Sequence, residues 1–385
     1  MFRGITANWM PVFAIVVAVI FVAEWTVRFL APQPLLNKLT VHDPVLGGRG
    51  APNGHAVVAP ADRPAFRIDL NASGMRVDEE VSRSTARRRV LVFGGSATFA
   101  AHLPYGQTYF AHLKERSELV DRRIQLLNAA FDRHGIWQSR LLMAEQIPRF
   151  KPTAMIYFFD AEAFARALVA GDGPRVGQLV YTPDGRPKLD ESTPPVPLEY
   201  LEALYRGLDW LQRHAHLAAL GREVFRQAAA RLDEALKGAA AEVRLSELPR
   251  FAAESADVQE RHFIFELHFQ KMMRMSSAAG VPLLIVWVPA RQELNPGRDR
   301  SSVADILRHQ RQLISQLASG FPRTAFWDTV SALQSRGGLP NPATLYEALT
   351  NSNSRHLNAP GALWFADAVS PAIIDFLEAV FAGRF

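Results

Sequence analysis

A serine that follows two glycines at the end of an apolar run is the residue in this sequence whose setting most favours chemistry. The stretch Val90-Leu91-Val92-Phe93-Gly94-Gly95-Ser96-Ala97-Thr98-Phe99 predicts a β-strand, a tight turn and the start of a helix. Such a turn exposes the Ser96 hydroxyl at the carboxyl end of a sheet, where open α/β folds bind their ligands. Glycine permits the backbone angles and close approaches that a Cβ would forbid. The alternative is an ordinary strand-to-helix turn in which the serine only caps the helix.

Further segments, in a fixed order along the chain, accompany this turn. They are Asp43-Pro44-Val45-Leu46-Gly47, Asn71-Ala72-Ser73-Gly74-Met75-Arg76, Asn128-Ala129-Ala130 followed by Gly135-Ile136-Trp137-Gln138-Ser139, and His356-Leu357-Asn358-Ala359-Pro360-Gly361. Together with the Gly-Gly-Ser-x-Thr pattern at 94–98, they resemble the blocks of the SGNH (GDSL-type) hydrolase superfamily in its membrane-anchored bacterial form. The resemblance lies in the order and spacing of the blocks, since no single block would be specific.

The resemblance implies a nucleophile and a base. A serine hydroxyl is weakly nucleophilic at neutral pH and needs a base, which in turn needs a third group to orient it. Ser96 matches the family's nucleophile and His356 its catalytic base, whereas the aspartate three residues before that histidine is replaced here by Asn353. An amide accepts a hydrogen bond from the imidazole but does not stabilise the imidazolium as a carboxylate does. Losing that carboxylate in a serine triad typically lowers the rate about 10⁴-fold.

The family's oxyanion site is altered as well. It uses the backbone N–H of the serine, here Ser96, a backbone N–H from a glycine of the second block, which aligns with Ala130, and an asparagine side chain of the third block. The asparagine position falls on Ala161, or on Asp160 if the register shifts by one. Alanine keeps its N–H, but neither third-block residue supplies an amide donor. Losing one such donor lowers the rate about 10²–10³-fold.

Polar residues on predicted loops at the same sheet edge are candidates for replacing the missing groups. Asp132, His134, Asp160 and Glu162 are candidates for orienting His356 or binding a substrate; the alternative is that Asp160 and Glu162 are surface acids. His102 and His134 are interpreted as loop histidines rather than ligands. No spacing of His, Asp or Glu indicates a metal site, and no cofactor is implied. An α/β-hydrolase nucleophile elbow is excluded, because Thr98 stands where that motif requires glycine.

Strand and helix patterns alternate after residue 89, which predicts a parallel sheet flanked by helices. The resemblance implies the three-layer α/β/α SGNH fold with a flavodoxin-like sheet. Strands are predicted at Val90–Phe93, Ile124–Asn128, Ala154–Phe159, Pro282–Val288 and Ala325–Trp327, and helices at Tyr109–Ser117, Trp137–Arg149, Ala304–Ala318 and Gly361–Phe381. The Leu- and Ala-rich interval 197–280 interrupts the alternation with helical spacing and is interpreted as a helical insertion.

The N-terminus predicts a membrane-spanning helix. Residues 9–23 carry no charge, and the apolar character resumes after Glu24 as far as Leu30, giving about the ~20 residues that a span needs. A cleaved signal peptide is the alternative, but no convincing cleavage site follows a short apolar core. We expect an uncleaved signal anchor at 1–31, a linker and irregular lead-in at 32–89, and the SGNH-like domain at 90–385.

Composition sets further bounds on the function. The chain has 385 residues, of which 48% are hydrophobic and 21% charged, so a sizeable core can form. It has no cysteine, which excludes disulfides, thiol nucleophiles and Cys-type zinc sites. The formal net charge is +5, but the basic residues are scattered and no nucleic-acid motif accompanies them.

The resemblance implies ester chemistry on an acyl group. We expect a serine esterase or O-acetyltransferase (O-acyltransferase) held in the inner membrane by its N-terminal helix, with the domain in the periplasm. The expected substrates are acylated envelope or extracellular polysaccharides, and membrane-bound acyl-transfer or polysaccharide-export proteins are the expected partners. The alternative is a catalytically degenerate SGNH fold that binds carbohydrate or serves in the assembly of such a system.

Overall fold

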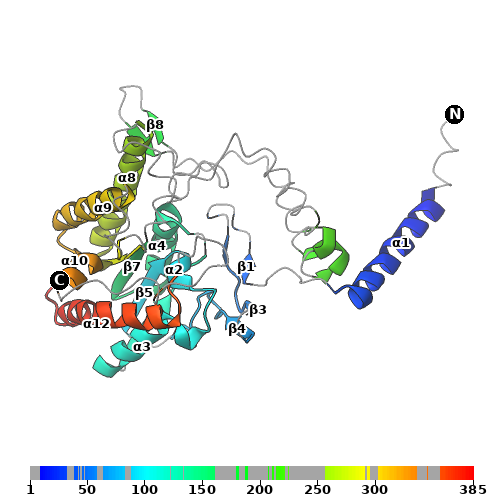
Figure 1. The fold of residues 1–385 in the computed structure, drawn as a ribbon, viewed down its shortest axis with the longest axis horizontal. Coiled ribbons are helices and arrows are strands. Elements are labelled where there is room, and N and C mark those ends of the chain that lie inside the picture. Colours follow the sequence, from blue (N-terminus) through cyan, green and yellow to red (C-terminus); the bar gives the residue numbers. More distant parts are fainter. Residues whose placement is uncertain are drawn as a thin grey trace. The chain divides into compact units, whose positions relative to one another are not determined.

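The computed structural model describes most of the chain and divides it into two compact units. The described residues are 9–32, 39–41, 43, 46, 48–58, 64–82, 88–121, 123–132, 134–160, 179–181, 187–189, 207, 210–211, 214–221, 224, 256–290, 293–294, 302–335, 345 and 356–385. One unit comprises residues 1–38 and 195–241, and the other comprises 39–194 and 242–385. The second unit contains the sheet and both Ser96 and His356 (Figure 1).

A five-stranded parallel sheet forms the centre of the second unit. Its strands, in spatial order, are β11 (Thr324–Trp327), β10 (Leu283–Val288), β7 (Ala154–Asp160), β5 (Arg88–Gly94) and β6 (Ile124–Asn128). Counted along the chain within this sheet, the order is 2-1-3-4-5, which is the flavodoxin-like order. The chain reverses its direction of travel across the sheet between β5 and β7, so a crevice is expected at the carboxyl ends of these two strands.

Helices cover both faces of the sheet, giving the three-layer fold that was predicted. On one side α3 (Tyr109–Val120) packs against α12 (Ala359–Phe381), and on the other α4 (Ile136–Phe150) packs against α8 (Ala256–Ala279), which also contacts α9 (Ser302–Ser319), as Figure 1 shows. The shorter α2 (Ser96–Phe99), η2 (Tyr105–Gln107) and α10 (Thr329–Ser335) complete the described helices of this unit. All five predicted strands and all four predicted helices are present, with ends that differ by a few residues.

The core explains why the central strands read as continuous apolar runs. Side chains of a strand alternate between its faces, and in β7 Tyr157 and Phe159 contact Phe269 of α8. Phe158, between them, turns to the other face and packs against Phe365 of α12. A strand covered by helices on both sides has no polar face, as is usual in parallel sheets.

The lead-in packs against this unit through short antiparallel ladders. β1 (Thr40–Val41) pairs with β2 (Arg49–Gly50), and β3 (His55–Val58) pairs with β4 (Phe66–Asp69). Arg76 is buried and donates to three backbone carbonyls at and after the end of α2, those of Phe99, Ala100 and Leu103. Burial lowers the pKa of Arg76 to about 10. A further hairpin, β8 (Leu179–Tyr181) with β9 (Pro187–Leu189), was not predicted.

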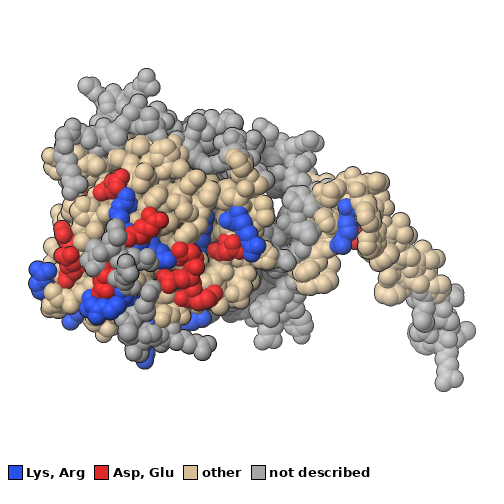
Figure 2. Space-filling view, turned by 90° about the horizontal axis from the view of Figure 1, so that it is seen from below, with Lys and Arg blue, Asp and Glu red and all other residues tan. Residues whose placement is uncertain are grey.

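The first unit contains α1 (Trp9–Leu30), the helix predicted as an anchor. Its residues 11–30 are long and apolar enough to cross a membrane, and none of that stretch is buried. Glu24 and Arg28 are its only charged residues. Figure 2 shows this contrast: α1 is uncharged over most of its surface, whereas acidic and basic side chains are interspersed on the visible face of the other unit. Within the predicted insertion 197–280, the described residues are helical apart from Ala215 and Gly280.

Candidate functional site

The turn that carries Ser96 is sterically fixed by its two glycines. β5 ends at Gly94, and Ser96 begins the one-turn helix α2. A Cβ on Gly94 would lie 2.1 Å from the Thr98 hydroxyl oxygen, and one on Gly95 would lie 2.8 Å from the His134 carbonyl oxygen. Neither distance is possible for a real side chain, so glycine is required at both positions. The predicted strand, turn and helix are therefore all present.

The structure brings Ser96 and His356 together. His356 Nε2 lies 3.0 Å from Ser96 Oγ, although 260 positions separate the two residues in the chain. Ser96 is 9% exposed, so its hydroxyl lies in a largely covered setting that opens towards the histidine. His356 precedes α12, whose N-cap is Asn358: its side chain accepts a hydrogen bond from Gly361 N at 2.8 Å. The cap fixes the start of α12 and with it the backbone next to the histidine.

A second histidine supports the first, which the sequence did not indicate. The ring centroids of His102 and His356 are 4.8 Å apart, at an angle of 36°. His102 Nε2 also lies 2.9 Å from the carbonyl oxygen of Leu357. Because a carbonyl only accepts, this nitrogen carries the hydrogen. His102 therefore touches both the ring of His356 and the peptide that follows it, and it is more than the loop histidine that was expected.

Asp160 ends β7 and lies beside the nucleophile turn. A Cβ on Gly95 would come within 3.3 Å of Asp160 Oδ2, so the carboxylate borders the residue that precedes Ser96. This position is the carboxyl end of the strand next to β5, at the crevice that the sheet order predicts. Of the acids proposed from the sequence, Asp160 is thus placed at the site.

A buried pair of hydroxyl groups and a side-chain amide stabilise the turn. Tyr109 of α3 donates from its hydroxyl to Thr98 Oγ1 at 2.7 Å, and burial raises the pKa of that tyrosine. Asn128, the last residue of β6, donates to the Thr98 carbonyl at 3.2 Å. Its Oδ1 accepts from the backbone N–H of Ala130 at 3.1 Å. The N–H predicted as an oxyanion donor thus binds a side-chain oxygen in this structure.

Gly135 is a second backbone N–H donor near the turn. It follows His134, whose carbonyl oxygen abuts Gly95, and it is the N-cap of α4. Its N–H donates to Gln138 Oε1 at 2.9 Å. Gly135 belongs to the second block of the resemblance, but nothing in the sequence pattern indicated a role for it.

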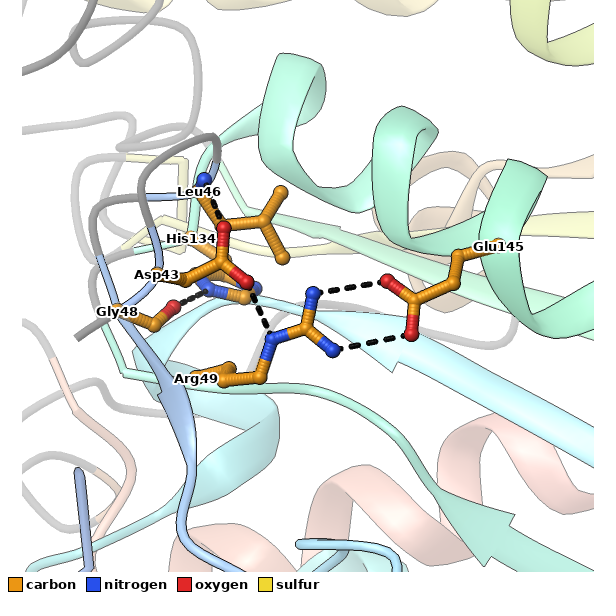
Figure 3. Close-up of polar contacts among 6 residues, drawn as sticks. All are labelled: Asp43, Leu46, Gly48, Arg49, His134 and Glu145. Carbon is orange, nitrogen blue, oxygen red and sulfur yellow. Dashed lines mark hydrogen bonds and ion pairs between the residues drawn. The ribbon is translucent and has the colours of Figure 1, made fainter. Parts of the chain in front are cut away.

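His134 joins the lead-in to the site instead of facing His356. Figure 3 shows His134 beside four residues of the lead-in, Asp43, Leu46, Gly48 and Arg49, and beside Glu145 of α4. His134 is 4% exposed and its Nε2 donates to the Gly48 carbonyl at 2.8 Å. Burial lowers the pKa of His134, which keeps the ring neutral. A neutral, buried ring of this kind holds the loop whose carbonyl abuts Gly95.

Arg49 fastens the same segment to α4. Its guanidinium donates to both carboxylate oxygens of Glu145, at 3.0 and 2.8 Å, and its Nε donates to Asp43 (Figure 3). Asp43 also accepts from the backbone N–H of Leu46 at 2.7 Å. A bidentate arginine–carboxylate pair fixes direction as well as distance. Asp43 belongs to the lead-in block of the resemblance, and its contacts give that block a structural purpose.

Other predicted residues are placed elsewhere or lie outside the described residues. Asn353, Ala161 and Glu162 belong to the latter group. Asp132 is half-buried on the loop between β6 and α4. Among the residues that the structure describes, no group of three His, Cys, Asp or Glu side chains could hold a metal ion. The arrangement on the page is a serine and a histidine in hydrogen-bond reach, which suits nucleophilic attack with general-base assistance.

Comparisons with known proteins give likenesses of fold. No family model and no curated protein matches the chain. Among solved structures, the α/β hydrolase enzyme LAE5 from the metagenome of Lake Arreo, Spain, has a TM-score of 0.42 and 11% identity over 74% of this chain and 96% of its own. The acetylxylan esterase Axe2 from Geobacillus stearothermophilus has a TM-score of 0.42 and 12% identity over 74% of this chain and 94% of its own. A protein of the G-D-S-L family from Desulfitobacterium hafniense, described as lipolytic, has a TM-score of 0.37 and 11% identity over 74% and 99%. At such identities, the function has to be argued from this chain's own side chains.

Proposed function

We propose that this chain is a membrane-anchored serine esterase or O-acyltransferase of the SGNH type, acting on acylated envelope or extracellular polysaccharide. The observation that carries the proposal is the 3.0 Å contact between Ser96 Oγ and His356 Nε2. The contact lies where β5 ends, beside the end of β7, which is where ligands bind in sheets of this strand order. The order of sequence blocks supports the SGNH assignment.

The reaction would run through an acyl-enzyme. Ser96 Oγ attacks the carbonyl carbon of the ester while His356 Nε2 takes its proton, and the carbonyl oxygen becomes an oxyanion. When the tetrahedral intermediate collapses, the imidazolium returns the proton to the departing alcohol. Water then cleaves the Ser96 ester in a hydrolase, whereas a sugar hydroxyl takes the acyl group in a transferase. His356 acts again as base in that second half.

Supporting groups distinguish this site from a full triad. Asn353 is the proposed orienting group for His356, with Asp160 and Glu162 as the acids that could replace the missing carboxylate. The N–H groups of Ser96 and Ala130 are the proposed oxyanion donors, and Ala130 would have to release Asn128 Oδ1 in order to serve. The contact of His134 with Gly48 favours a structural role for that histidine over substrate binding.

A second candidate function follows from Asp160. Its carboxylate borders Gly95, next to the serine whose reaction would place an oxyanion nearby. A like charge at short range disfavours the formation of another. This observation favours a catalytically silent fold that binds carbohydrate or takes part in assembly. The position of Asp160 therefore has to be weighed against the serine–histidine contact by experiment.

Hydrolysis of a small acetyl ester by the full chain separates the two functions. For an enzyme we expect a wild-type rate that is abolished in Ser96→Ala, and a higher rate in Asn353→Asp, since a carboxylate in a serine triad contributes up to about 10⁴ in rate. A rate that is indifferent to Ser96→Ala would refute the enzyme. Adding a sugar acceptor distinguishes transfer from hydrolysis, because only transfer yields an acylated sugar.

The anchor is the second part of the proposal. The apolar, unburied residues 11–30 of α1 favour an inner-membrane span with the sheet unit in the periplasm, close to membrane-bound acyl-transfer or export proteins. Deleting residues 1–32 should move the protein from washed membranes into the soluble fraction. A truncated protein that stays in the membranes would contradict the anchor or require a further membrane contact.

A further inference from the structure

A helical stretch of the insertion contacts the C-terminal turns of α1. This stretch, the 207–224 segment, is described at 207, 210–211, 214–221 and 224, where all residues but Ala215 are helical. It belongs to the same compact unit as α1. Ala219 is only 1% exposed, and Glu24 and Val27 of α1 are half-buried in a helix that is otherwise exposed over most of its length. The 207–224 segment and α1 therefore pack against each other.

Two charged side chains of α1 bind the backbone at the break in the segment. Glu24 accepts hydrogen bonds from the N–H of His216 at 3.0 Å and of Leu217 at 2.8 Å. Arg28 donates to the His214 carbonyl at 3.0 Å and pairs with Glu24 at 3.2 Å. The carboxylate thus meets N–H groups at the start of one helical piece, and the guanidinium meets a carbonyl at the end of the other, which is the favourable polarity at both ends.

These contacts set the depth of the segment in a membrane. Glu24 lies six residues before the end of α1, or about 9 Å along the axis at ~1.5 Å per residue. A carboxylate at that depth needs partners, because the hydrocarbon region offers no water to solvate it. Its partners are the N–H groups of His216 and Leu217, so the segment has to reach the same depth. Trp25 of α1, at that level, is the kind of residue found at membrane interfaces.

Among the described residues, the other side of the segment is uncharged and exposed. Before the break at Ala215 these residues are Gly207, Trp210, Leu211 and His214, whose spacing places them on one side of a helix, and after the break they are Gly221 and Val224. Trp210 is 59% exposed, Leu211 42% and Val224 59%. The Trp210 and His214 rings stack at 4.9 Å, which holds the indole outward. Exposed apolar side chains that gather on one side of a segment are typical of surfaces that contact a membrane or a protein.

We propose that the 207–224 segment lies in the membrane interface, with the face of Trp210, Leu211 and Val224 in contact with lipid. The proposal rests on the membrane anchor put forward above and gives the helical insertion a role that the anchor alone does not. An interfacial helix buries its apolar face about 5–10 Å into the boundary between headgroups and acyl chains, which matches the level of Glu24. The segment thereby adds a membrane contact that depends on Glu24 of α1, so deletion of residues 1–32 removes it together with the span.

Depth-dependent quenching in vesicles tests this directly. The chain has no cysteine, so each cysteine variant of the full-length protein carries one environment-sensitive label. Labels at Trp210→Cys and Val224→Cys report on the exposed face, and a label at Phe13→Cys reports on the span. A label at Ala144→Cys, an exposed position of α4, reports on the unit that is expected to lie in water. The protein is placed in vesicles of phosphatidylethanolamine and phosphatidylglycerol that contain lipids with a nitroxide either near the headgroup or near the chain end.

Labels at 210 and 224 should be quenched more by the shallow nitroxide than by the deep one, and the label at 13, within the span, should be quenched by the lipid nitroxides as well. The proposal would be overturned if aqueous iodide quenched the labels at positions 210 and 224 as strongly as the label at position 144. The anchor would remain supported in that case if lipid nitroxides still quenched the label at position 13. Protection from both quenchers would mean that protein covers the face, which also overturns it. A label at 13 without lipid quenching would refute the anchor itself.

Paired variants of α1 sharpen the result. Glu24→Ala removes both backbone contacts, so shallow quenching at 210 should fall towards the level at 144, while the label at 13 is unchanged. Thr26→Ala is the matched control, since the Thr26 hydroxyl donates within α1 to the Val22 carbonyl at 2.8 Å. Equal quenching at 210 in wild type and Glu24→Ala would contradict the assignment of Glu24 as the residue that holds the segment at that depth.

Discussion

At the scale of residues, His102 stands out beside the serine and histidine that were expected to meet. It follows α2, the helix that Ser96 begins, and it contacts both the His356 ring and the Leu357 carbonyl. The nucleophile turn and the loop of the base are thus joined by a side chain from the same short stretch. His102 is a positioning residue: it acts on the reaction only through His356.

We expect His102→Asn to lower kcat on a small acetyl ester about 2- to 10-fold with an unchanged KM, since one neutral hydrogen bond contributes about 0.5–1.5 kcal/mol. His112→Asn, on α3 outside the site, is the matched control. Equal kinetics in the two variants would show that His102 does not support the base.

Sequence patterns reach some of these residues and not others. Ser96 could be predicted because the strand, the glycines and the hydroxyl are adjacent in the chain. The contact of His102 with His356 could not, since it joins positions that are 254 residues apart. His134 was expected to orient His356 or to bind substrate, but the lead-in covers it and Gly48 takes its N–H. That contact depends on how a Pro- and Gly-rich segment folds back, which no local pattern specifies.

At the scale of elements, the turn between β5 and α2 depends on the loop before α4. The His134 carbonyl oxygen lies against Gly95. The loop that carries it is held by the hydrogen bond of His134 to Gly48 and by the Arg49–Glu145 ion pair. The five strands were predictable because buried parallel strands are long apolar runs. The ladders β1–β2, β3–β4 and β8–β9 were less so, since strands of two to four residues owe their stability to tertiary contacts.

Gly95→Ala tests the fit of this turn. Its Cβ would lie 2.8 Å from the His134 carbonyl oxygen and 3.3 Å from Asp160 Oδ2, so the turn or the loop has to move. We expect a loss of about 1–3 kcal/mol in the free energy of unfolding, as for other overpacked sites, and about 100-fold lower esterase activity from a misplaced nucleophile. Gly106→Ala is the control, because a Cβ there meets no atom within 4 Å. Equal stability and activity of both variants would refute the steric account.

At the scale of the whole molecule, two units have different tasks. The sheet unit carries the serine–histidine contact, and the unit of α1 carries the two proposed membrane contacts. Alternating patterns predicted a parallel sheet, and the resemblance its flavodoxin-like type; the strand order 2-1-3-4-5 itself comes from how the crossovers pack. The pairing of α1 with residues 207–224 could not be predicted, because it rests on hydrogen bonds between segments about 190 positions apart.

The stability of the sheet unit should fall in acid. His268 of α8 is 1% exposed, and its burial, together with the charges of Arg140 and Lys271, lowers its pKa to about 3. The unfolded chain takes up this proton below about pH 6.5, whereas the folded chain does not, so the free energy of unfolding decreases as the pH falls. Between pH 7 and 5 this residue alone should remove about 2 kcal/mol.

Urea unfolding at the two pH values measures the effect. His268→Gln should flatten the pH dependence by about that 2 kcal/mol, whereas Gln312→Ala, at an exposed position of α9 without a titratable group, should leave it unchanged. Equal slopes in His268→Gln and wild type would contradict a neutral, buried His268.

Covalent labelling tests the central claim, an activated Ser96, without knowledge of the substrate. A serine-reactive fluorophosphonate added to the full chain should leave one adduct on Ser96 by mass spectrometry. Ser96→Ala should leave none, and His356→Gln should label far more slowly because the proton acceptor 3.0 Å from Ser96 Oγ is gone. Wild-type protein that stays unlabelled, or that labels at the same rate as His356→Gln, would contradict the nucleophile and its base.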